Sequence, residues 1–233
     1  ISIEALKNHP RISNTYVIRK KYTSLYKISK KLGKFDIFFS FRSSFRTKFF
    51  KLLISSKKKF QFDGNRYQNR HQVEKYNDFV NDNLNTNFHP GRLIVHPSLK
   101  PKDNNSKPIV GINPGASYGD SKRWHPEKFA KVATELSHKF DILIFGSVDE
   151  KNIATDIEKL LITKGVTNYK NLVGNTNIQE LINIISNLDL FITGDSGPMH
   201  IAASFQVPTV AIFGPTNDNE TSQWAVEKSI VVK

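Results

Sequence analysis

Short apolar runs alternate along the chain with longer amphipathic stretches. Runs rich in Ile, Val and Phe predict buried strands, whereas stretches with apolar residues three or four positions apart predict helices. Regular alternation of the two predicts an α/β protein, in which a parallel sheet is covered by helices on both faces. The predicted strands cover residues 15–19, 35–41, 60–62, 92–96, 109–113, 141–145, 171–173, 190–193 and 207–213, and the predicted helices cover 22–32, 43–54, 68–84, 126–138, 151–163, 178–188 and 199–205.

The regular alternation is interrupted at residues 85–108. This stretch is rich in Asn, Pro and Lys around one short predicted strand, and such a change in composition marks a connection between domains. We therefore place the interdomain connection at residues 91–108. It joins a domain at residues 1–90 to a second domain at residues 109–233.

The segment from Leu190 to Thr216, LFITGDSGPMHIAASFQVPTVAIFGPT, carries the most chemistry. It predicts a strand, a tight turn, a short helix with Pro198 as its first residue, and a second strand. The helix would direct its unpaired N–H groups and positive dipole end at the turn, where a phosphate could bind. Asp195 accepts hydrogen bonds and His200 can donate them, which suits a polar clamp. An ordinary strand–helix–strand crossover with a glycine-rich turn is the alternative.

Charge divides the chain into two contrasting parts. Residues 1–100 hold 21 Lys and Arg against 6 Asp and Glu, whereas residues 101–233 hold 13 against 15. A basic half suggests a polyanionic partner, either a nucleic acid or an anionic lipid surface with its phosphorylated glycolipids; a solvated Lys-rich surface is the third interpretation. The aromatic residues of this half are predicted to be core side chains rather than base-stacking platforms (Phe38, Phe39, Phe41, Phe45, Phe49 and Phe50).

Composition excludes several other classes of protein. The chain contains no cysteine, so neither disulfides nor Cys-ligated zinc can be proposed. No apolar run approaches the roughly 20 residues of a membrane-spanning helix, and the first stretch does not resemble a signal peptide. A globular protein of the cytosol is the expectation.

The sequence resembles the bacterial lipopolysaccharide heptosyltransferases, which transfer heptose from ADP-heptose. GDSGPMHIAA, followed by PTVAIFGPT, is similar to the C-terminal signature of that family. Upstream, NPGAS at residues 113–117, Gly119, KRW at 122–124 and PEKFA at 126–130 resemble the other nucleotide-sugar loop of the family. A weaker match is HQVEKY at residues 71–76.

This resemblance implies a GT-B architecture, with two Rossmann-like domains that contain parallel sheets. Residues 1–90 would be an incomplete acceptor-side domain, and residues 109–233 would be the donor domain. Because family members are longer than this chain, the resemblance also implies that the first strand–helix unit and the C-terminal tail are missing here. The implied activity is inverting transfer of heptose to the inner core of lipopolysaccharide in a Gram-negative bacterium, with the second heptose addition favoured over the first. The implied partners are ADP-heptose, a Kdo-lipid A or heptosyl-Kdo-lipid A acceptor and the anionic inner face of the inner membrane, with nucleic acid disfavoured.

The resemblance also implies the donor-site residues, and it implies no cofactor and no tightly bound metal. Lys122 and Ser117 match positions on the diphosphate, and Glu150 matches a carboxylate that holds the ribose hydroxyls. Tyr118 departs from the family pattern, which leaves the local phosphate geometry open. The full implied set for donor and nucleotide binding is Ser117, Lys122, Glu150, Asp195, Ser196, Gly197, His200, Gly214 and Thr216.

Each of these residues has a simpler interpretation. Lys122 can be a solvated loop charge, Glu150 a carboxylate that favours a helix start, and Trp124 a packing residue rather than a sugar platform. The general base of the family is expected in a segment before Ile1, so no base is named. The basic run of Lys57, Lys58 and Lys59 is predicted to face the acceptor or the membrane.

Two other functions remain open on the sequence. A different GT-B enzyme that uses another nucleotide sugar, such as an epimerase or an N-acetylglucosaminyltransferase, would share the same loops. A basic nucleic-acid-binding protein would explain the charge of the first hundred residues alone. Affinity for ADP-heptose would distinguish a heptosyltransferase from the first alternative. Salt-dependent binding of duplex DNA without nucleotide-sugar affinity would favour the second alternative.

Overall fold

The computed structural model describes residues 2–97, 107–115 and 124–233, which form two compact units. Residues 1–13 and 92–233 belong to one unit, here called the large unit, and residues 14–91 form the other, here called the basic unit. Residues 1–13 group with the large unit, whereas the sequence pattern predicts them in the first domain.

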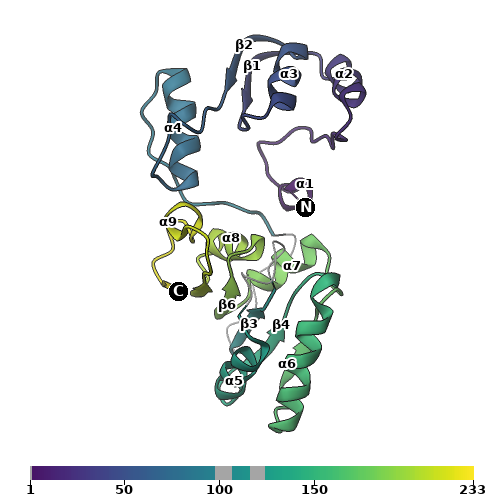
Figure 1. Ribbon diagram of the computed structural model, residues 1–233, viewed down its shortest axis with the longest axis vertical. Helices are drawn as coiled ribbons and strands as arrows, with labels where there is room; N and C mark the ends of the chain where they lie inside the picture. Colours follow the sequence, from purple (N-terminus) through teal and green to yellow (C-terminus); the bar gives the residue numbers. More distant parts are fainter. Residues whose placement is uncertain (1, 98–106, 116–123) are drawn as a thin grey trace. The chain divides into compact units, whose positions relative to one another are not determined.

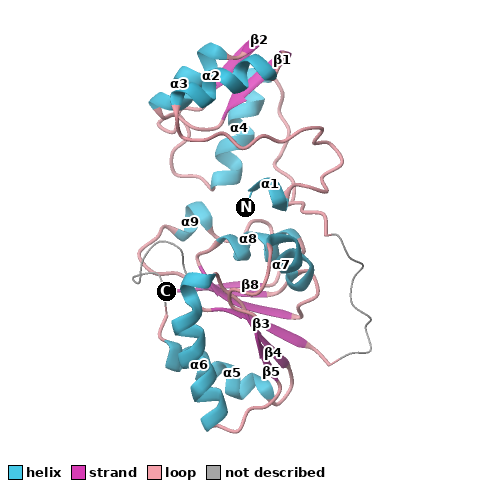
Figure 2. Cartoon of the chain, turned by 90° about the vertical axis from the view of Figure 1, so that its right-hand side faces the viewer, coloured by secondary structure: helices cyan, strands magenta, loops and turns pink. Residues whose placement is uncertain are grey.

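The large unit is built on a sheet of six parallel strands in the order β5-β4-β3-β6-β7-β8 (Figure 2). The chain runs outward from β3 in one direction, then returns to β6 and runs outward in the other. The sheet therefore has the order of doubly wound nucleotide-binding folds, with its switch point between β3 and β6. The predicted α/β class with parallel sheets is confirmed. The strands are β3 Ile109–Asn113, β4 Asp141–Ile144, β5 Tyr169–Asn171, β6 Leu190–Gly194, β7 Thr209–Ile212 and β8 Ser229–Val232.

Helices cover both faces of this sheet because successive strand side chains point to opposite faces. Val110 and Ile112 of β3 pack with α5 and α6 on one face, whereas Phe191 of β6 packs with α7 and α8 on the other. Gly111 lies under the second face, where an added Cβ would come within 2.5 Å of Leu188 Cδ1. The helices of this unit are α1 Ser2–Ala5, α5 Pro126–Ser137, α6 Lys151–Thr163, α7 Ile178–Ile185, α8 Gly197–Ser204 and α9 Asp218–Thr221, and the short 3-10 helix η2 spans Val148–Glu150.

The basic unit contains two parallel strands and three helices in its described residues (Figure 1). Its core is aromatic: Phe62, Tyr67 and Phe79 are buried together. Part of the prediction that the aromatic side chains are core was wrong, because Phe45 is 78% exposed and Phe41 is 41% exposed. The elements are α2 Tyr22–Lys31, β1 Lys34–Ser40, α3 Phe45–Leu53, β2 Ser55–Gln61 and α4 Gln72–Leu84.

The HQVEKY motif has a local structural role at the start of α4. His71 is the N-cap, and its Nδ1 accepts a hydrogen bond from the amide of Val73 at 3.2 Å. Glu74 reaches back to accept a hydrogen bond from the amide of His71 at 3.0 Å. These reciprocal bonds satisfy amides that a helix start would otherwise leave unpaired.

Two predicted strands do not form. Residues 15–19 and 92–96 have the apolar, β-branched composition of strands, but neither segment pairs with another strand in the described part of the chain. A strand requires a partner for its ladder, and composition alone does not supply one. Other boundaries moved: β2 is longer than predicted and β5 begins earlier, and α1, α9 and β8 were not predicted. None of the helices in the described residues is long and apolar enough to cross a bilayer.

Candidate functional site

A cavity of about 700 Å³ opens at the carboxyl end of the large unit's sheet. It is lined by Asn113 at the end of β3, by Phe145 and Gly146 after β4, and by Ser196 and Gly197 after β6. Neighbouring strands diverge in their connections at the switch point, which is where open α/β sheets bind their ligands. The cavity is therefore large enough for a ligand and lies where this sheet topology predicts a binding site.

A buried polar network joins β3 to β6 at the floor of this cavity. The Asn113 amide is 3% exposed, and its Nδ2 donates to Thr193 Oγ1 at 3.2 Å and to Ser196 Oγ at 3.1 Å. The Thr193 and Ser196 hydroxyls lie 3.1 Å apart and share a hydrogen bond. Because buried polar groups need partners, this network fixes the turn after β6 relative to β3.

The turn after β6 directs the N-terminus of α8 at the cavity. Ser196 is the N-cap, but its side chain makes no bond to the first-turn amides, because it is committed to Asn113 and Thr193. Gly197 is the first helical residue and Pro198 the second, which corrects the prediction that Pro198 comes first. The positive end of the helix dipole therefore faces the cavity uncapped by a side chain, which suits an anion.

Glu150 is a buried carboxylate in the wall of the same cavity. It is 6% exposed, and its Oε2 accepts a hydrogen bond from the amide of Ser147 at the start of η2. The backbone of Gly115 approaches so closely that an added Cβ would lie 1.8 Å from Glu150 Oε1. The simpler interpretation of Glu150 as a helix-start carboxylate is therefore correct for one of its oxygens, while the same side chain also lines the cavity.

The structure brings some of the predicted donor-site residues together. Glu150, Ser196, Gly197 and His200 all line the one cavity. Asp195 lies half-buried in the turn after β6. Their roles in binding a donor remain predictions. Two members of the set follow β7, at the same edge of the sheet (Gly214 and Thr216).

Two other members of the predicted set, Ser117 and Lys122, lie outside the described residues. Their proposed contacts with a diphosphate stay predictions. Within the described ranges, no group of three His, Cys, Asp or Glu side chains is placed to hold a metal ion.

Sequence reasoning gave no role to several residues that shape the cavity. Asn113 and Gly115 entered the prediction only as part of the NPGAS motif. An Asn at the carboxyl end of a buried strand could nevertheless have indicated a polar site. The segment 92–96, predicted as a strand, instead supplies the apolar wall of the cavity through Leu93, Ile94 and Val95. An apolar wall suits the ring of a nucleobase.

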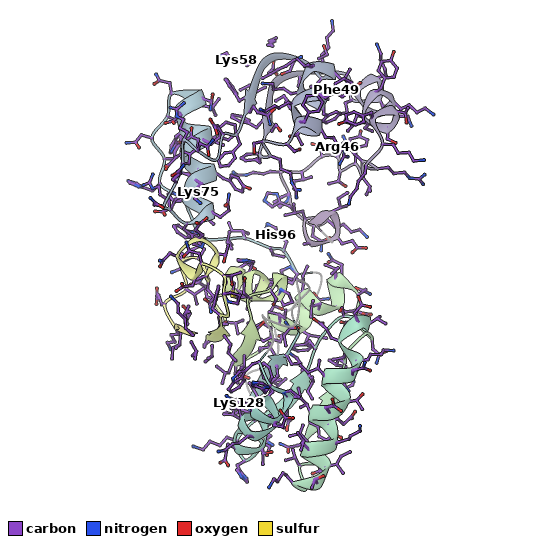
Figure 3. The ribbon with its side chains drawn as sticks, in the orientation of Figure 1. Arg46, Phe49, Lys58, Lys75, His96 and Lys128 are labelled. Atoms are coloured by element: carbon purple, nitrogen blue, oxygen red, sulfur yellow. The ribbon has the colours of Figure 1, made fainter. Side chains whose placement is uncertain are left out.

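Trp124 is a packing residue, as favoured in the sequence analysis. Its ring contacts Phe129 edge to face, with the ring centroids 5.1 Å apart, and it packs against the buried cluster under α5 and α6. The ammonium group of Lys128, labelled in Figure 3, lies 5.6 Å from the centroid of the Trp124 ring.

The three lysines predicted to face the acceptor or the membrane lie on β2 of the basic unit. Strand alternation sends Lys58, labelled in Figure 3, to the face opposite Lys57 and Lys59. Lys57 pairs with Asp36 at 2.7 Å, and both side chains are more than four-fifths exposed, so the pair contributes little to stability. The run is therefore two charged faces of one strand rather than a single patch.

Comparison with known proteins identifies the family. Residues 37–233 match the family described as glycosyltransferase family 9 (heptosyltransferase). The chain is 40% identical to lipooligosaccharide heptosyltransferase 2 of Campylobacter jejuni serotype O:2, over 100% of this chain and 74% of that protein. It is 39% identical to the serotype O:6 protein of the same name, over 91% of this chain and 68% of that protein.

Solved structures show the same fold. A family 9 glycosyltransferase from Veillonella parvula aligns with a TM-score of 0.82 at 20% identity, over 98% of this chain and 74% of that one. The E. coli ADP-heptose heptosyltransferase II aligns with a TM-score of 0.73 at 20% identity, over 90% of this chain and 71% of that one. On the family match and the Campylobacter relatives, this chain belongs to glycosyltransferase family 9, the heptosyltransferase family.

Proposed function

We propose that this protein is a heptosyltransferase II that transfers heptose from ADP-heptose to a heptosyl-Kdo-lipid A acceptor of the lipopolysaccharide inner core. Family membership supports the reaction class, and the name shared by its Campylobacter relatives supports the second heptose addition. The observation that carries the donor assignment is one cavity that joins a buried carboxylate, Glu150, to the uncapped N-terminus of α8.

In this proposal, the base, the ribose and the diphosphate of an adenine nucleotide each contact a different part of the cavity. The apolar wall of Leu93 and Val95 receives the adenine, and Glu150 accepts hydrogen bonds from the ribose hydroxyls. The diphosphate then reaches the α8 N-terminus beside His200, where backbone amides and the helix dipole favour negative charge. Ser117 and Lys122 complete the diphosphate site in this proposal.

The reaction is a displacement at the anomeric carbon of the heptose. The acceptor hydroxyl attacks from the side opposite ADP, and a new carbon–oxygen bond forms as the bond to the β-phosphate oxygen breaks. The proton of the hydroxyl passes to a base that we do not assign, and ADP leaves with the bonding electron pair. The α8 N-terminus stabilises the charge that develops on the departing diphosphate.

The test uses the purified full-length protein with ADP-heptose and two acceptors, Kdo-lipid A and heptosyl-Kdo-lipid A. Mass spectrometry should detect a product one heptose heavier from the second acceptor and little from the first. Preference for the acceptor without heptose would reassign the protein to the first addition. Transfer from UDP-N-acetylglucosamine but not from ADP-heptose would replace the proposed donor.

The basic unit supports binding to the anionic membrane surface that holds such an acceptor. Residues 14–91 hold 17 Lys and Arg against 5 Asp and Glu. Each Lys or Arg near an anionic lipid surface adds about 1 kcal/mol of attraction. We propose that this charge holds the enzyme at the inner face of the inner membrane as a peripheral protein.

A further inference from the structure

Two side chains after β7 have buried polar atoms without a hydrogen-bond partner in the described structure. Gln223 is 9% exposed, and both its Nε2 and its Oε1 lack a partner. Thr216 Oγ1 is also buried and unpaired. The Asn113 amide, by contrast, bonds to two hydroxyls in the same unit. Since native proteins pair nearly all buried polar groups, an unpaired amide and hydroxyl on one segment indicate partners that the described residues do not supply.

The segment that carries Gln223 and Thr216 is firmly held, so their lack of partners does not reflect a loose loop. The amide of Phe213 donates to the carbonyl of Val232 at 2.8 Å, which ties the start of the segment to β8. Asn217 caps α9 through its side chain, and the amide of Ser222, next to Gln223, donates to the Asp218 carbonyl at 2.9 Å.

The segment begins at the same edge of the sheet as the nucleotide cavity. β7 is the parallel neighbour of β6, so their carboxyl ends lie side by side. Figures 1 and 2 both place α9, which lies between Thr216 and Gln223 in sequence, beside α8. Along this edge Glu150 follows β4, the α8 N-terminus follows β6, and Thr216 and Gln223 follow β7.

This order matches the order of groups in a nucleotide sugar. If the nucleoside binds at β4 and the diphosphate at β6, the next strand reaches the group beyond the diphosphate, which is the sugar. The chemistry agrees: an amide and a hydroxyl together donate and accept, as sugar hydroxyls do, whereas a phosphate only accepts and would leave Gln223 Oε1 unmatched. We propose that Gln223 and Thr216 bind hydroxyl groups of the sugar that the enzyme transfers. This inference rests on the proposed function.

The decisive experiment separates sugar binding from nucleotide binding in the full-length protein. Gln223→Leu and Thr216→Val keep the approximate side-chain size and remove the polar atoms. We expect each to weaken ADP-heptose about 3- to 10-fold, the loss of one neutral hydrogen bond, with ADP affinity unchanged in calorimetric titrations. The thermal midpoint of the ligand-free protein should stay the same or rise, because an unpaired buried group has been removed.

Thr209→Val is the matched control. Thr209 is 2% exposed on β7, and its Oγ1 donates to the Val207 carbonyl at 2.8 Å. Removing that paired hydroxyl should lower the thermal midpoint and leave the ratio of ADP-heptose to ADP affinity unchanged. Thr216→Val should therefore weaken ADP-heptose binding relative to ADP without lowering the thermal midpoint, whereas Thr209→Val should lower the thermal midpoint without changing that affinity ratio.

Two outcomes would overturn the assignment. Equal weakening of ADP and ADP-heptose would place the two side chains at the nucleotide. Unchanged affinity for both ligands would mean that water alone satisfies them. If Gln223→Leu does not fold, Gln223→Met and Thr216→Val carry the test under the same criteria. Failure of the unmodified protein to bind ADP-heptose would instead contradict the proposed function, before any variant is compared.

Discussion

The two units of this chain differ in charge and in how fully their apolar side chains are buried. Residues 92–233 hold 15 Lys and Arg against 15 Asp and Glu, around a six-stranded sheet whose central strands are almost completely buried. Residues 14–91 hold 17 against 5, and Phe45 and Leu52 of α3 are 78% and 73% exposed. The large unit is thus built as a rigid neutral frame for a cavity, whereas the basic unit presents charge and apolar side chains on its surface.

This contrast suggests a division of labour. In the proposed function, a few preorganised polar groups of the large unit hold a small soluble donor, so single substitutions there should act strongly on catalysis. In the same proposal, many charges of the basic unit attract a lipid-anchored anionic acceptor, so substitutions there should act weakly and in a graded way. Substitutions in each unit can therefore test whether the large unit binds the donor and the basic unit attracts the acceptor.

The largest effect is expected from Asp195→Ala and His200→Ala in full-length enzyme. Each should lower turnover at least about 100-fold, the scale of losing a preorganised contact in the transition state, with a modest change in thermal midpoint. Steady-state transfer assays measure the effect. Asp156→Ala and His138→Ala, both at exposed positions of the same unit, should leave turnover unchanged. Near-normal activity of both site variants would remove them from the donor site.

Neutralising Lys57, Lys58 and Lys59 together tests the basic unit. Binding to anionic vesicles should weaken about 5- to 10-fold, because Lys58 and Lys59 lie on opposite faces of β2 and only one of them can approach a membrane closely, at about 1 kcal/mol, while Asp36 already offsets Lys57. The apparent KM for lipid acceptor should rise while KM for ADP-heptose stays the same. Neutralising three exposed lysines of the large unit is the control (Lys159, Lys164 and Lys170).

Duplex DNA measured in parallel decides between the two polyanion interpretations of this charge. If vesicle affinity and acceptor KM are unchanged in the triple variant, the three lysines are ordinary surface charge. Salt-dependent DNA binding that falls in the variant, without vesicle binding in the unmodified protein, would support the nucleic-acid interpretation instead.

Gly115→Ala tests how closely the donor cavity is fitted. The new Cβ would lie 1.8 Å from Glu150 Oε1, so the carboxylate must move, and we expect ADP to bind about tenfold more weakly. In a Glu150→Ala background the same change should have little further effect, since the group it displaces is gone. Gly64→Ala is the control, because its Cβ would meet its nearest neighbour at an ordinary 3.8 Å. If the losses of ADP affinity add up in the double variant, Gly115 does not act through the position of Glu150.

The smallest effect concerns Tyr67 in the aromatic core of the basic unit. Burial, helped by the 2.8 Å hydrogen bond to Asp82, raises the pKa of Tyr67 from 10.0 to about 12. A raised pKa stabilises the fold below pH 10, and this contribution is lost as pH rises from 10 to 12. Tyr67→Phe should destabilise the basic unit by about 1 kcal/mol at neutral pH and remove this part of the alkaline loss.

The two tryptophans make this measurement specific to one unit. Trp124 and Trp224 both belong to the large unit, so their fluorescence reports its unfolding, while circular dichroism reports both units. Tyr67→Phe should change the circular dichroism transition and leave the tryptophan transition in place. An identical pH dependence in the variant and the unmodified protein would contradict the assigned pKa.

Much of the large unit follows from local sequence pattern, because in a doubly wound sheet each strand and helix has its own periodic signal. Helix α6 and strand β3 begin and end at the predicted residues. Residues 92–96 have an equally apolar pattern, but strand formation depends on a partner elsewhere in the chain. Pattern identifies an element, whereas pairing decides whether a strand forms.

Only some residues of the candidate site could be predicted from the sequence motifs. His200 and Glu150 were named by resemblance, and both line the cavity. The fit of Gly115 against Glu150 could not be read from the sequence, because it joins two loops that only the folded sheet brings together. The unpaired amide of Gln223 is likewise a property of burial, which a sequence does not display.

The most direct test of the central claim is a calorimetric titration of the full-length protein with ADP-heptose. The account predicts saturable binding of one ADP-heptose per chain, competition by ADP, and a large loss of affinity in His200→Ala. Vesicle affinity should be the same in that variant and in the unmodified protein. Absence of ADP-heptose binding, or binding that His200→Ala leaves intact, would contradict the claim that the large unit holds the donor.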